Sequence, residues 1–138
     1  MVEKNELYKV KIIDDGYQGE GIAKIDNFPI FIQGAIKGEE IEIKILKVQS
    51  NFAYGKIVKI IKSAPYRIKE ECEEYSKCGG CNLRHMKYEY TLEIKKAIVE
   101  NCLYKQFNRD IQVNDVIGMK EPMFYRNKLQ YPLRFRQR

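Results

Sequence analysis

The stretch Glu40-Ile41-Glu42-Ile43-Lys44-Ile45-Leu46-Lys47-Val48 alternates apolar and charged residues more cleanly than any other part of the chain. A period of two is typical of a β-strand with one buried face. Similar runs lie on both sides of it, and Gly, Asp and Asn separate them as turn residues do. Five short strands within about 60 residues predict a small closed barrel. The other four runs are residues 7–13, 22–25, 28–32 and 52–61.

One barrel of this kind, the five-stranded OB-fold, binds nucleic acid through an open face and the loops beside it. Here the candidates for that surface are the loop of residues 14–21, three aromatic side chains and two lysines that could contact phosphates. These side chains are Tyr17, Phe52, Tyr54, Lys24 and Lys47. The competing interpretation is that the aromatic residues fill the barrel core and that the lysines only keep the protein soluble.

The formal net charge of the chain is +6, and the stretch from Arg126 to Arg138 holds five basic residues and no acidic one. Excess positive charge indicates a polyanion partner, although a well-solvated basic protein is the alternative. No apolar run is long enough to span a bilayer, and the N-terminal MVEKNELYKV lacks the apolar core of a signal peptide. We therefore expect no membrane partner and a cytoplasmic, reducing location, where clustered cysteines bind metal or do redox work.

Three of the four cysteines, Cys72, Cys78 and Cys81, lie close together with the spacing C-x5-C-x2-C. A C-x2-C turn that contains glycines lets thiolates converge, which suits zinc or an iron–sulfur cluster. Either group normally takes four ligands, so four arrangements stay open. In the first, the fourth ligand is a cysteine beyond this chain, and in the second it is Cys102. In the third, His85 completes a Cys3His zinc site. In the fourth, no metal is bound. Cys102 falls in the apolar stripe of a predicted helix, where a free cysteine usually acts as a small buried hydrophobe.

The second half of the chain has a different pattern. Ser63-Ala64-Pro65 ends the barrel, and residues 87–107 have helical periodicity up to Asn108-Arg109-Asp110. Strand-like runs at 111–117 and 128–135 follow. We expect an OB-like barrel in residues 1–64. Residues 65–138 would hold the metal loop, one α-helix and the first strands of an incomplete α+β central domain. The predicted apolar stripe of the helix comprises Leu92, Ala97, Ile98, Val99, Cys102 and Leu103, with Ile94 at its edge.

Three motifs give a resemblance to a known family. The run from Tyr17 to Ile45, with Gly19-Glu20-Gly21-Ile22-Ala23 and Gly38-Glu39, resembles a TRAM domain, an OB-like module that binds RNA. The pattern C-x5-C-G-G-C-x-L-x-H-x-x-Y, residues 72–88, is similar to the cluster loop of RNA (uracil-5-)-methyltransferases. The run Phe124 to Lys128 is similar to a second motif of that family. Together the motifs resemble most closely the subgroup that acts on 23S ribosomal RNA.

The resemblance implies that Cys72, Cys78 and Cys81, with one distant cysteine, hold a [4Fe-4S] cluster. It also implies that the fourth cluster ligand, the S-adenosylmethionine-binding domain, the nucleophilic cysteine and the catalytic base lie beyond Arg138. The chain would then be the RNA-recognition part of a methyltransferase and would be inactive by itself.

The partner implied by the resemblance is RNA, and 23S ribosomal RNA in particular. Arg126 and Lys128 are candidates for contacts with phosphates near the target nucleotide, and salt bridges or an exposed strand face are the alternative for both. The competing function is a stand-alone RNA-binding module with a structural zinc or iron–sulfur knuckle and no catalytic activity.

Overall fold

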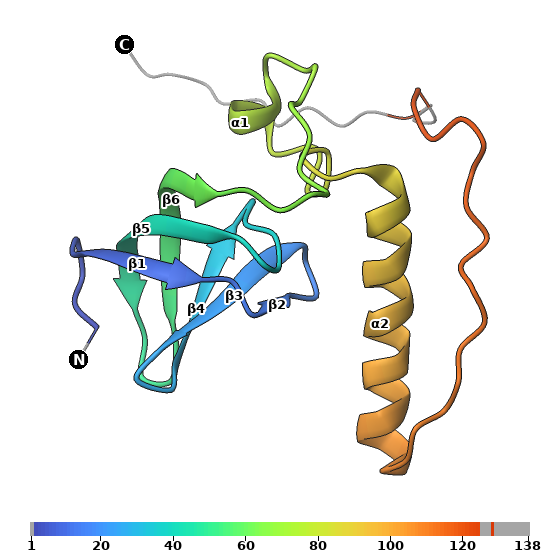
Figure 1. Ribbon diagram of the computed structural model, residues 1–138, viewed down its shortest axis with the longest axis horizontal. Helices are drawn as coiled ribbons and strands as arrows, with labels where there is room; N and C mark the ends of the chain where they lie inside the picture. Colours follow the sequence, from blue (N-terminus) through green and yellow to red (C-terminus); the bar gives the residue numbers. More distant parts are fainter. Residues whose placement is uncertain (1, 125–127, 129–138) are drawn as a thin grey trace.

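The structure, a computed structural model, describes residues 2–124 and residue 128 of the 138-residue chain. Within these residues, six strands form one curled sheet and two helices follow it (Figure 1). The strands are β1 (Leu7–Lys11), β2 (Asp14–Asp15), β3 (Glu20–Ile25), β4 (Phe28–Gln33), β5 (Glu40–Val48) and β6 (Ala53–Lys62). The helices are α1 (Tyr75–Cys78) and α2 (Tyr88–Phe107).

The order of the strands explains why the sheet curls. The order is β1-β5-β6-β4-β3-β2, and only the β4–β6 pair is parallel. The two outermost strands, β1 and β2, are neighbours in the chain, and only Ile12 and Ile13 separate them. The Ile12 N–H donates to the Glu39 carbonyl oxygen and the Ile13 N–H to that of Ile22. The segment that contains β1 and β2 therefore pairs with β5 through its first part and with β3 through its second part, which curls the sheet. The prediction of a mainly β, OB-like barrel is confirmed.

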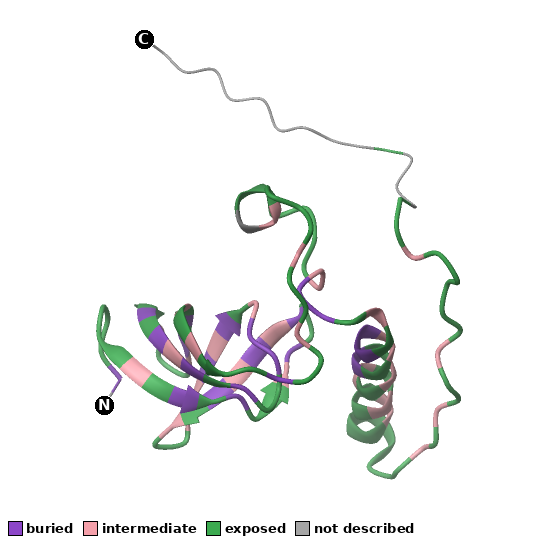
Figure 2. Cartoon of the chain, turned by 45° about the horizontal axis from the view of Figure 1, so that its top comes forward, coloured by how far each residue is buried: buried purple, intermediate pink, exposed green. Residues whose placement is uncertain are grey.

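The core of the barrel follows from the alternation in the sequence. Ile41, Ile43 and Ile45 of β5 are fully buried, whereas Lys44 between them is exposed. The same alternation on the other strands gives the purple and green bands of Figure 2. Burying apolar side chains from every strand supplies most of the free energy that stabilises such a fold. The cluster comprises Val2, Val10, Ile12, Ala23, Ile30, Ile32, Ala35, Ile41, Ile43, Ile45 and Ala53.

The structure differs from the sequence-based expectation at residues 14–21, which we expected to form one loop. Asp14 and Asp15 instead form β2, paired with Ile22 and Gly21 of β3. The loop itself shrinks to residues 16–19. The reason is non-local, because the first strand bends after Lys11 and its second part closes the sheet against β3. Two aspartates have low strand propensity, so no local signal reveals this pairing.

A second apolar cluster joins the barrel to the helical half of the chain. Ile36 of the barrel packs with Met86, Tyr90 and Ile94, and Ala64 belongs to the same cluster. The rings of Tyr66 and Tyr90 are stacked, with centroids 4.1 Å apart and an interplanar angle of 5°. The segment that contains the cysteines is therefore held against the barrel at its base.

Helix α2 matches the predicted span but not the predicted buried face. It ends where expected, with Asn108 in the left-handed conformation and its N–H donating to the Tyr104 carbonyl oxygen. Its buried residues are Tyr90, Thr91 and Ile94, whereas Val99 and Cys102 are exposed. The interpretation of Cys102 as a buried hydrophobe is therefore wrong. The cause is that the second half of α2 extends away from the barrel (Figure 1), so nothing from the barrel covers its apolar positions.

Residues 111–117, expected as a strand, form no strand in the structure. They run back along α2 (Figure 1), and the Asp115 carboxylate accepts a hydrogen bond from Lys96 Nζ at 2.7 Å. Strand residues need a neighbouring strand for their backbone hydrogen bonds, and α2 cannot supply one. The second expected strand, 128–135, lies outside the described residues except for Lys128. No helix in the described part of the chain is long and apolar enough to cross a membrane.

Candidate functional site

Three aromatic side chains gather on the outer surface of the barrel. Phe31 of β4 lies between the inward-facing Ile30 and Ile32, and so it points outward. The parallel pairing of β4 with β6 sets Phe31 beside Tyr54, and Phe52 precedes β6. The ring centroids are 5.5 Å apart for Phe31 and Phe52, 5.3 Å for Phe52 and Tyr54, and 6.3 Å for Phe31 and Tyr54. We call these three residues the aromatic platform.

The sequence left open whether Phe52 and Tyr54 lie on the surface or in the barrel core. Tyr54 is 46% exposed and Phe52 is partly exposed, so neither belongs to the barrel core. Phe31 was not among the predicted site residues. The signal for it was present, because a phenylalanine between two isoleucines of a strand must face the other side of the sheet.

The other residues that the sequence predicts to contact RNA are exposed wherever the structure describes them. Lys47 lies opposite Tyr54 in the strand register, so the structure brings it to the platform. Lys24 lies on the outer side of β3, opposite Pro29 of β4. Tyr17 is 78% exposed in the turn between β2 and β3. Lys128 is exposed outside any helix or strand. Arg126 lies outside the described residues.

The segment that carries the cysteines is closed at its base by backbone pairing. Arg67 and Met86 form an antiparallel bridge. The Ile68 N–H donates to the His85 carbonyl oxygen at 3.0 Å, and the Lys87 N–H donates to that of Tyr66 at 2.8 Å. Residues 69–84 thus form a loop whose two ends are fixed to each other. We call these residues the cysteine loop.

The three clustered thiols lie on the surface of the cysteine loop. Helix α1 ends at Cys78, Gly79 takes the left-handed conformation with φ of 66°, and Cys81 follows. Cys72, Cys78 and Cys81 are all exposed free thiols. Helix α1 and Gly79 turn the loop back on itself. Three cysteine thiols are chemically suitable ligands for an iron–sulfur cluster or for zinc. In the described residues, however, no three His, Cys, Asp or Glu side chains converge on a metal position.

His85 is placed differently from the cysteines. Its side chain is 1% exposed, and its Nδ1 lies 2.6 Å from the Tyr75 hydroxyl, which also lies 3.2 Å from the Asn82 carbonyl oxygen. Donation from Nδ1–H to the Tyr75 oxygen and from the Tyr75 hydroxyl to Asn82 satisfies both hydrogens. The His85 Nε2 atom is then a buried lone pair without a partner. Sequence reasoning offered His85 as a zinc ligand, but it does not converge with the cysteines here.

Burial controls the protonation of this pair. Desolvation and, to a smaller extent, the nearby Arg67 guanidinium lower the pKa of His85 to about 4, although Glu70 and Glu39 act in the opposite direction. Desolvation also raises the pKa of the Tyr75 hydroxyl. At neutral pH both side chains are therefore uncharged.

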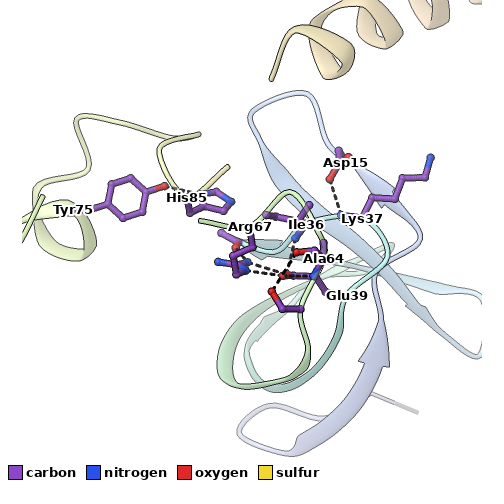
Figure 3. A network of polar contacts seen from close by, with 10 residues as sticks. Asp15, Ile36, Lys37, Glu39, Ala64, Arg67, Tyr75 and His85 are labelled. Atoms are coloured by element: carbon purple, nitrogen blue, oxygen red, sulfur yellow. Dashed lines mark hydrogen bonds and ion pairs between the residues drawn. The ribbon is translucent and has the colours of Figure 1, made fainter. Parts of the chain in front are cut away.

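An ion pair anchors the start of the cysteine loop to the barrel. The Glu39 side chain is fully buried and accepts hydrogen bonds from Arg67 Nε at 2.6 Å and Nη2 at 2.8 Å (Figure 3). It also accepts from the backbone N–H groups of Ile36 and Ala64. Arg67 Nη2 donates in addition to the Gly34 carbonyl oxygen at 2.6 Å. Every polar atom of the Glu39 carboxylate is thus satisfied, which a buried charge needs.

The end of the cysteine loop also contacts the barrel. Leu83 lies over Gly19, and a Cβ atom added at Gly19 would come within 2.3 Å of Leu83 Cδ2. Gly19 also has a φ of +85°, a conformation that costs any other L-residue about 1–2 kcal/mol. Two independent reasons therefore require glycine at this turn.

Replacing Gly19 by alanine is expected to lower the free energy of unfolding more than the same change at Gly38. Gly38 has a similar φ of +89° but nothing within 4 Å of its added Cβ. We expect Gly38→Ala to cost about 1–2 kcal/mol and Gly19→Ala about 1 kcal/mol more, because only the latter also displaces Leu83. Urea unfolding followed by circular dichroism measures both. Equal losses would show that the Leu83 contact adds nothing to stability.

Comparison with known proteins assigns the barrel to a domain family. Residues 2–58 match the TRAM domain family. The chain contains a TRAM domain. The match covers all six strands of the barrel except the end of β6. The structure shows that the TRAM barrel carries the aromatic platform on its outer face and is joined to the cysteine loop through Glu39 and Gly19.

Relatives of the TRAM-containing chain extend the match beyond the barrel. Uncharacterized RNA methyltransferases of Clostridium acetobutylicum and Clostridium tetani are 47% and 46% identical to it, and one of Staphylococcus aureus is 42% identical. Each alignment covers 96% of this chain but only 29% of the relative. The chain thus spans less than a third of the length of these relatives. A conserved protein of Methanococcus maripaludis, solved in solution, is 41% identical over 42% of this chain and 83% of its own, with a TM-score of 0.41.

Proposed function

We propose that this chain is the RNA-recognition part of an S-adenosylmethionine-dependent methyltransferase that modifies C5 of a uridine in 23S ribosomal RNA. The observation that carries the proposal is the union of a TRAM barrel and a C-x5-C-x2-C loop in one folded unit, in a chain related to RNA methyltransferases. The finer assignment to uracil C5 and to 23S ribosomal RNA is supported by the cysteine motif and by the run Phe124 to Lys128.

The role of the barrel would be to hold RNA near the site of methylation. Exposed aromatic rings accept unpaired bases by stacking, and exposed lysines attract phosphates. The platform and Lys47 offer both kinds of contact within one small area. Methylation of C5 needs a thiolate that adds to C6 and a base that removes the C5 proton. We assign neither role to a residue of this chain.

The role of the cysteine loop would be to hold a [4Fe-4S] cluster. Cys72, Cys78 and Cys81 would supply three thiolates, and a cysteine outside these 138 residues would supply the fourth. Such a group would supply folding free energy to a loop that has little apolar core of its own. Because the base of the loop is already closed by the Arg67–Met86 bridge, the cluster would order the cysteines rather than close the loop. Zinc is the alternative occupant.

A cytoplasmic location belongs to the same proposal. Ribosomal RNA and reduced, metal-binding thiols both occur in that compartment. Cys72, Cys78 and Cys81 would have to stay reduced to serve as thiolate ligands.

The proposal is tested on the complete product of the gene that encodes this chain, purified without oxygen. We expect about four irons and four sulfides for each chain, as a [4Fe-4S] cluster requires. We also expect transfer of a labelled methyl group from S-adenosylmethionine to a 23S ribosomal RNA transcript, with 5-methyluridine as the product in mass spectrometry. Substituting Cys78 by serine should lower the iron content, since it removes one of the three local thiolates.

Other outcomes would contradict specific parts of the proposal. Stoichiometric zinc without sulfide would replace the cluster by a zinc knuckle. Methylation of transfer RNA but not of 23S ribosomal RNA would refute the substrate. RNA binding by a product that transfers no methyl group to any RNA would support a stand-alone RNA-binding module.

A further inference from the structure

The platform sits at the centre of a row that crosses the barrel surface. The register places Phe31 of β4 between Ile22 of β3 and Tyr54 of β6. Tyr54 in turn lies beside Lys47 of β5, and Ile22 lies beside Asp14 of β2. The row therefore begins with a carboxylate, passes over the aromatic rings and ends with an ammonium group. The Asp14 carboxylate is paired with Lys37 Nζ at 3.4 Å, whereas Lys47 has no acidic partner in the strand register. A negatively charged chain that crosses the rings is therefore drawn toward β5.

The next row along the same face adds positive charge without any acid. Lys44 of β5 lies opposite Lys56 of β6, and Leu7 of β1 lies on the other side of Lys44. Both lysines are exposed, because Ile43, Ile45 and Gly55 take the inward positions next to them. Two lysines that lie opposite each other on a sheet repel, and an anion bound between them would relieve this repulsion.

The remaining lysines of β1, β5 and β6 on this face are partly compensated, with one carboxylate for each two lysines. Glu42 lies between Lys9 and Lys59 in the strand register, whereas Lys44 has no acidic neighbour on either side. The row after that repeats the pattern, with Glu40 between Lys11 and Lys62. Positive potential is therefore concentrated beside the platform rather than spread over β1, β5 and β6.

We infer that an unpaired RNA segment crosses the barrel over β4, β6 and β5, with bases stacked on Phe31, Phe52 and Tyr54 and phosphates beside Lys44, Lys47 and Lys56. This inference rests on the proposed RNA-binding function and adds the class of RNA and its path. A duplex does not fit, because its bases are already stacked inside the helix and cannot reach the rings. Single-stranded RNA offers both free base faces and phosphates.

The stacking part of the path is tested by fluorescence anisotropy with a labelled oligouridine of about ten nucleotides, which matches the site size of such barrels. We expect Tyr54→Ala and Phe31→Leu each to raise the dissociation constant roughly 5- to 150-fold. Leucine keeps the apolar contact of the half-buried Phe31 and removes only the ring. Tyr54→Phe is the matched control and should stay within about twofold of the wild type, since the ring is kept.

The charge part is tested by the salt dependence of the same titration. We expect Lys56→Ala and Lys44→Ala each to reduce the slope of log K against log salt by roughly 0.7, the value for one phosphate contact with a single strand. Lys59→Ala is the matched control, because Lys59 is also exposed on β6 but lies opposite Glu42. Its slope should equal that of the wild type.

The outcomes separate this inference from the function on which it rests. Wild-type affinity in Tyr54→Ala and Phe31→Leu would overturn stacking on the platform while leaving RNA binding by the barrel intact. An equal loss of slope in Lys59→Ala and Lys56→Ala would overturn the path. Preference for a duplex would overturn the class of RNA. Absence of any binding by the wild type would overturn the proposed RNA recognition itself.

Discussion

Replacing Arg67 by methionine is expected to lower the free energy of unfolding by about 3–5 kcal/mol at neutral pH, the range found when one partner of a buried ion pair is removed. Arg67 makes two hydrogen bonds to a fully buried Glu39 carboxylate and a third to the Gly34 carbonyl oxygen. Methionine would leave that carboxylate charged and without its cation. Because Arg67 begins the cysteine loop, the loss should also loosen the loop from the barrel.

The pH dependence of this effect has a definite sign. Desolvation tends to raise the pKa of Glu39, but the hydrogen bond from Arg67 and the backbone N–H groups outweigh it, so that the pKa lies below 4.5. The wild-type stabilisation is therefore complete above about pH 4.5 and is lost as pH falls through the lowered pKa. In Arg67→Met the desolvation is no longer balanced, and the pKa of Glu39 should rise. The variant should then become relatively more stable on mild acidification.

Urea unfolding at two pH values, followed by circular dichroism, measures both effects. Lys37→Ala is the control, because the Lys37–Asp14 pair, 3.4 Å apart, is about half exposed on both sides. An exposed pair contributes only about 0–1 kcal/mol, so this control should stay near the wild type. A loss in Arg67→Met no larger than that of Lys37→Ala would show that Glu39 does not depend on Arg67.

Acidification from about pH 7.5 to about pH 5 is expected to lower the free energy of unfolding by about 2 kcal/mol through His85 alone. The reason is that its pKa lies at about 4 in the folded chain and at about 6.5 in the unfolded one. A histidine with a lowered pKa stabilises the fold fully above the unfolded value, and this contribution is lost as pH falls toward the folded value. The loss therefore develops between about pH 6.5 and about pH 4.

The single histidine of the chain makes this prediction easy to assign. The variant His85→Phe keeps an aromatic ring of similar size but does not titrate. Its stability should change little between the same two pH values, although it starts lower because the Tyr75 hydrogen bond is gone. The measurement is urea unfolding of the metal-free chain. The same acid-induced loss in wild type and variant would assign the effect to carboxylates instead.

The Glu39–Arg67 ion pair and the His85–Tyr75 pair both stabilise the base of the cysteine loop. Arg67 fixes the start of the cysteine loop, and His85 fixes its end through the backbone pair with Ile68 and the bond to Tyr75. The bases of many metal loops depend on the metal itself. Here the contacts that close the base of the loop and attach it to the barrel involve none of the cysteines.

The sequence alone determined the features that depend on local pattern. The alternation in β5 predicted a strand with Ile41, Ile43 and Ile45 on one face, and these residues belong to the core of the barrel. Helical periodicity located α2, and Asn108 ended it as expected. Both patterns are local, because the direction of a side chain follows from the backbone of its own element.

The tertiary structure alone decided which elements lie against each other. No local pattern pairs Asp14 with Ile22 or Phe31 with Tyr54, because strand partners are chosen by closure of the whole barrel. Periodicity indicated an apolar face on α2 but not that the barrel covers only its first half, and so the placement of Cys102 was wrong. The Glu39–Arg67 pair likewise joins residues far apart in the sequence. Burial depends on what packs over a face, and that is a property of the complete fold.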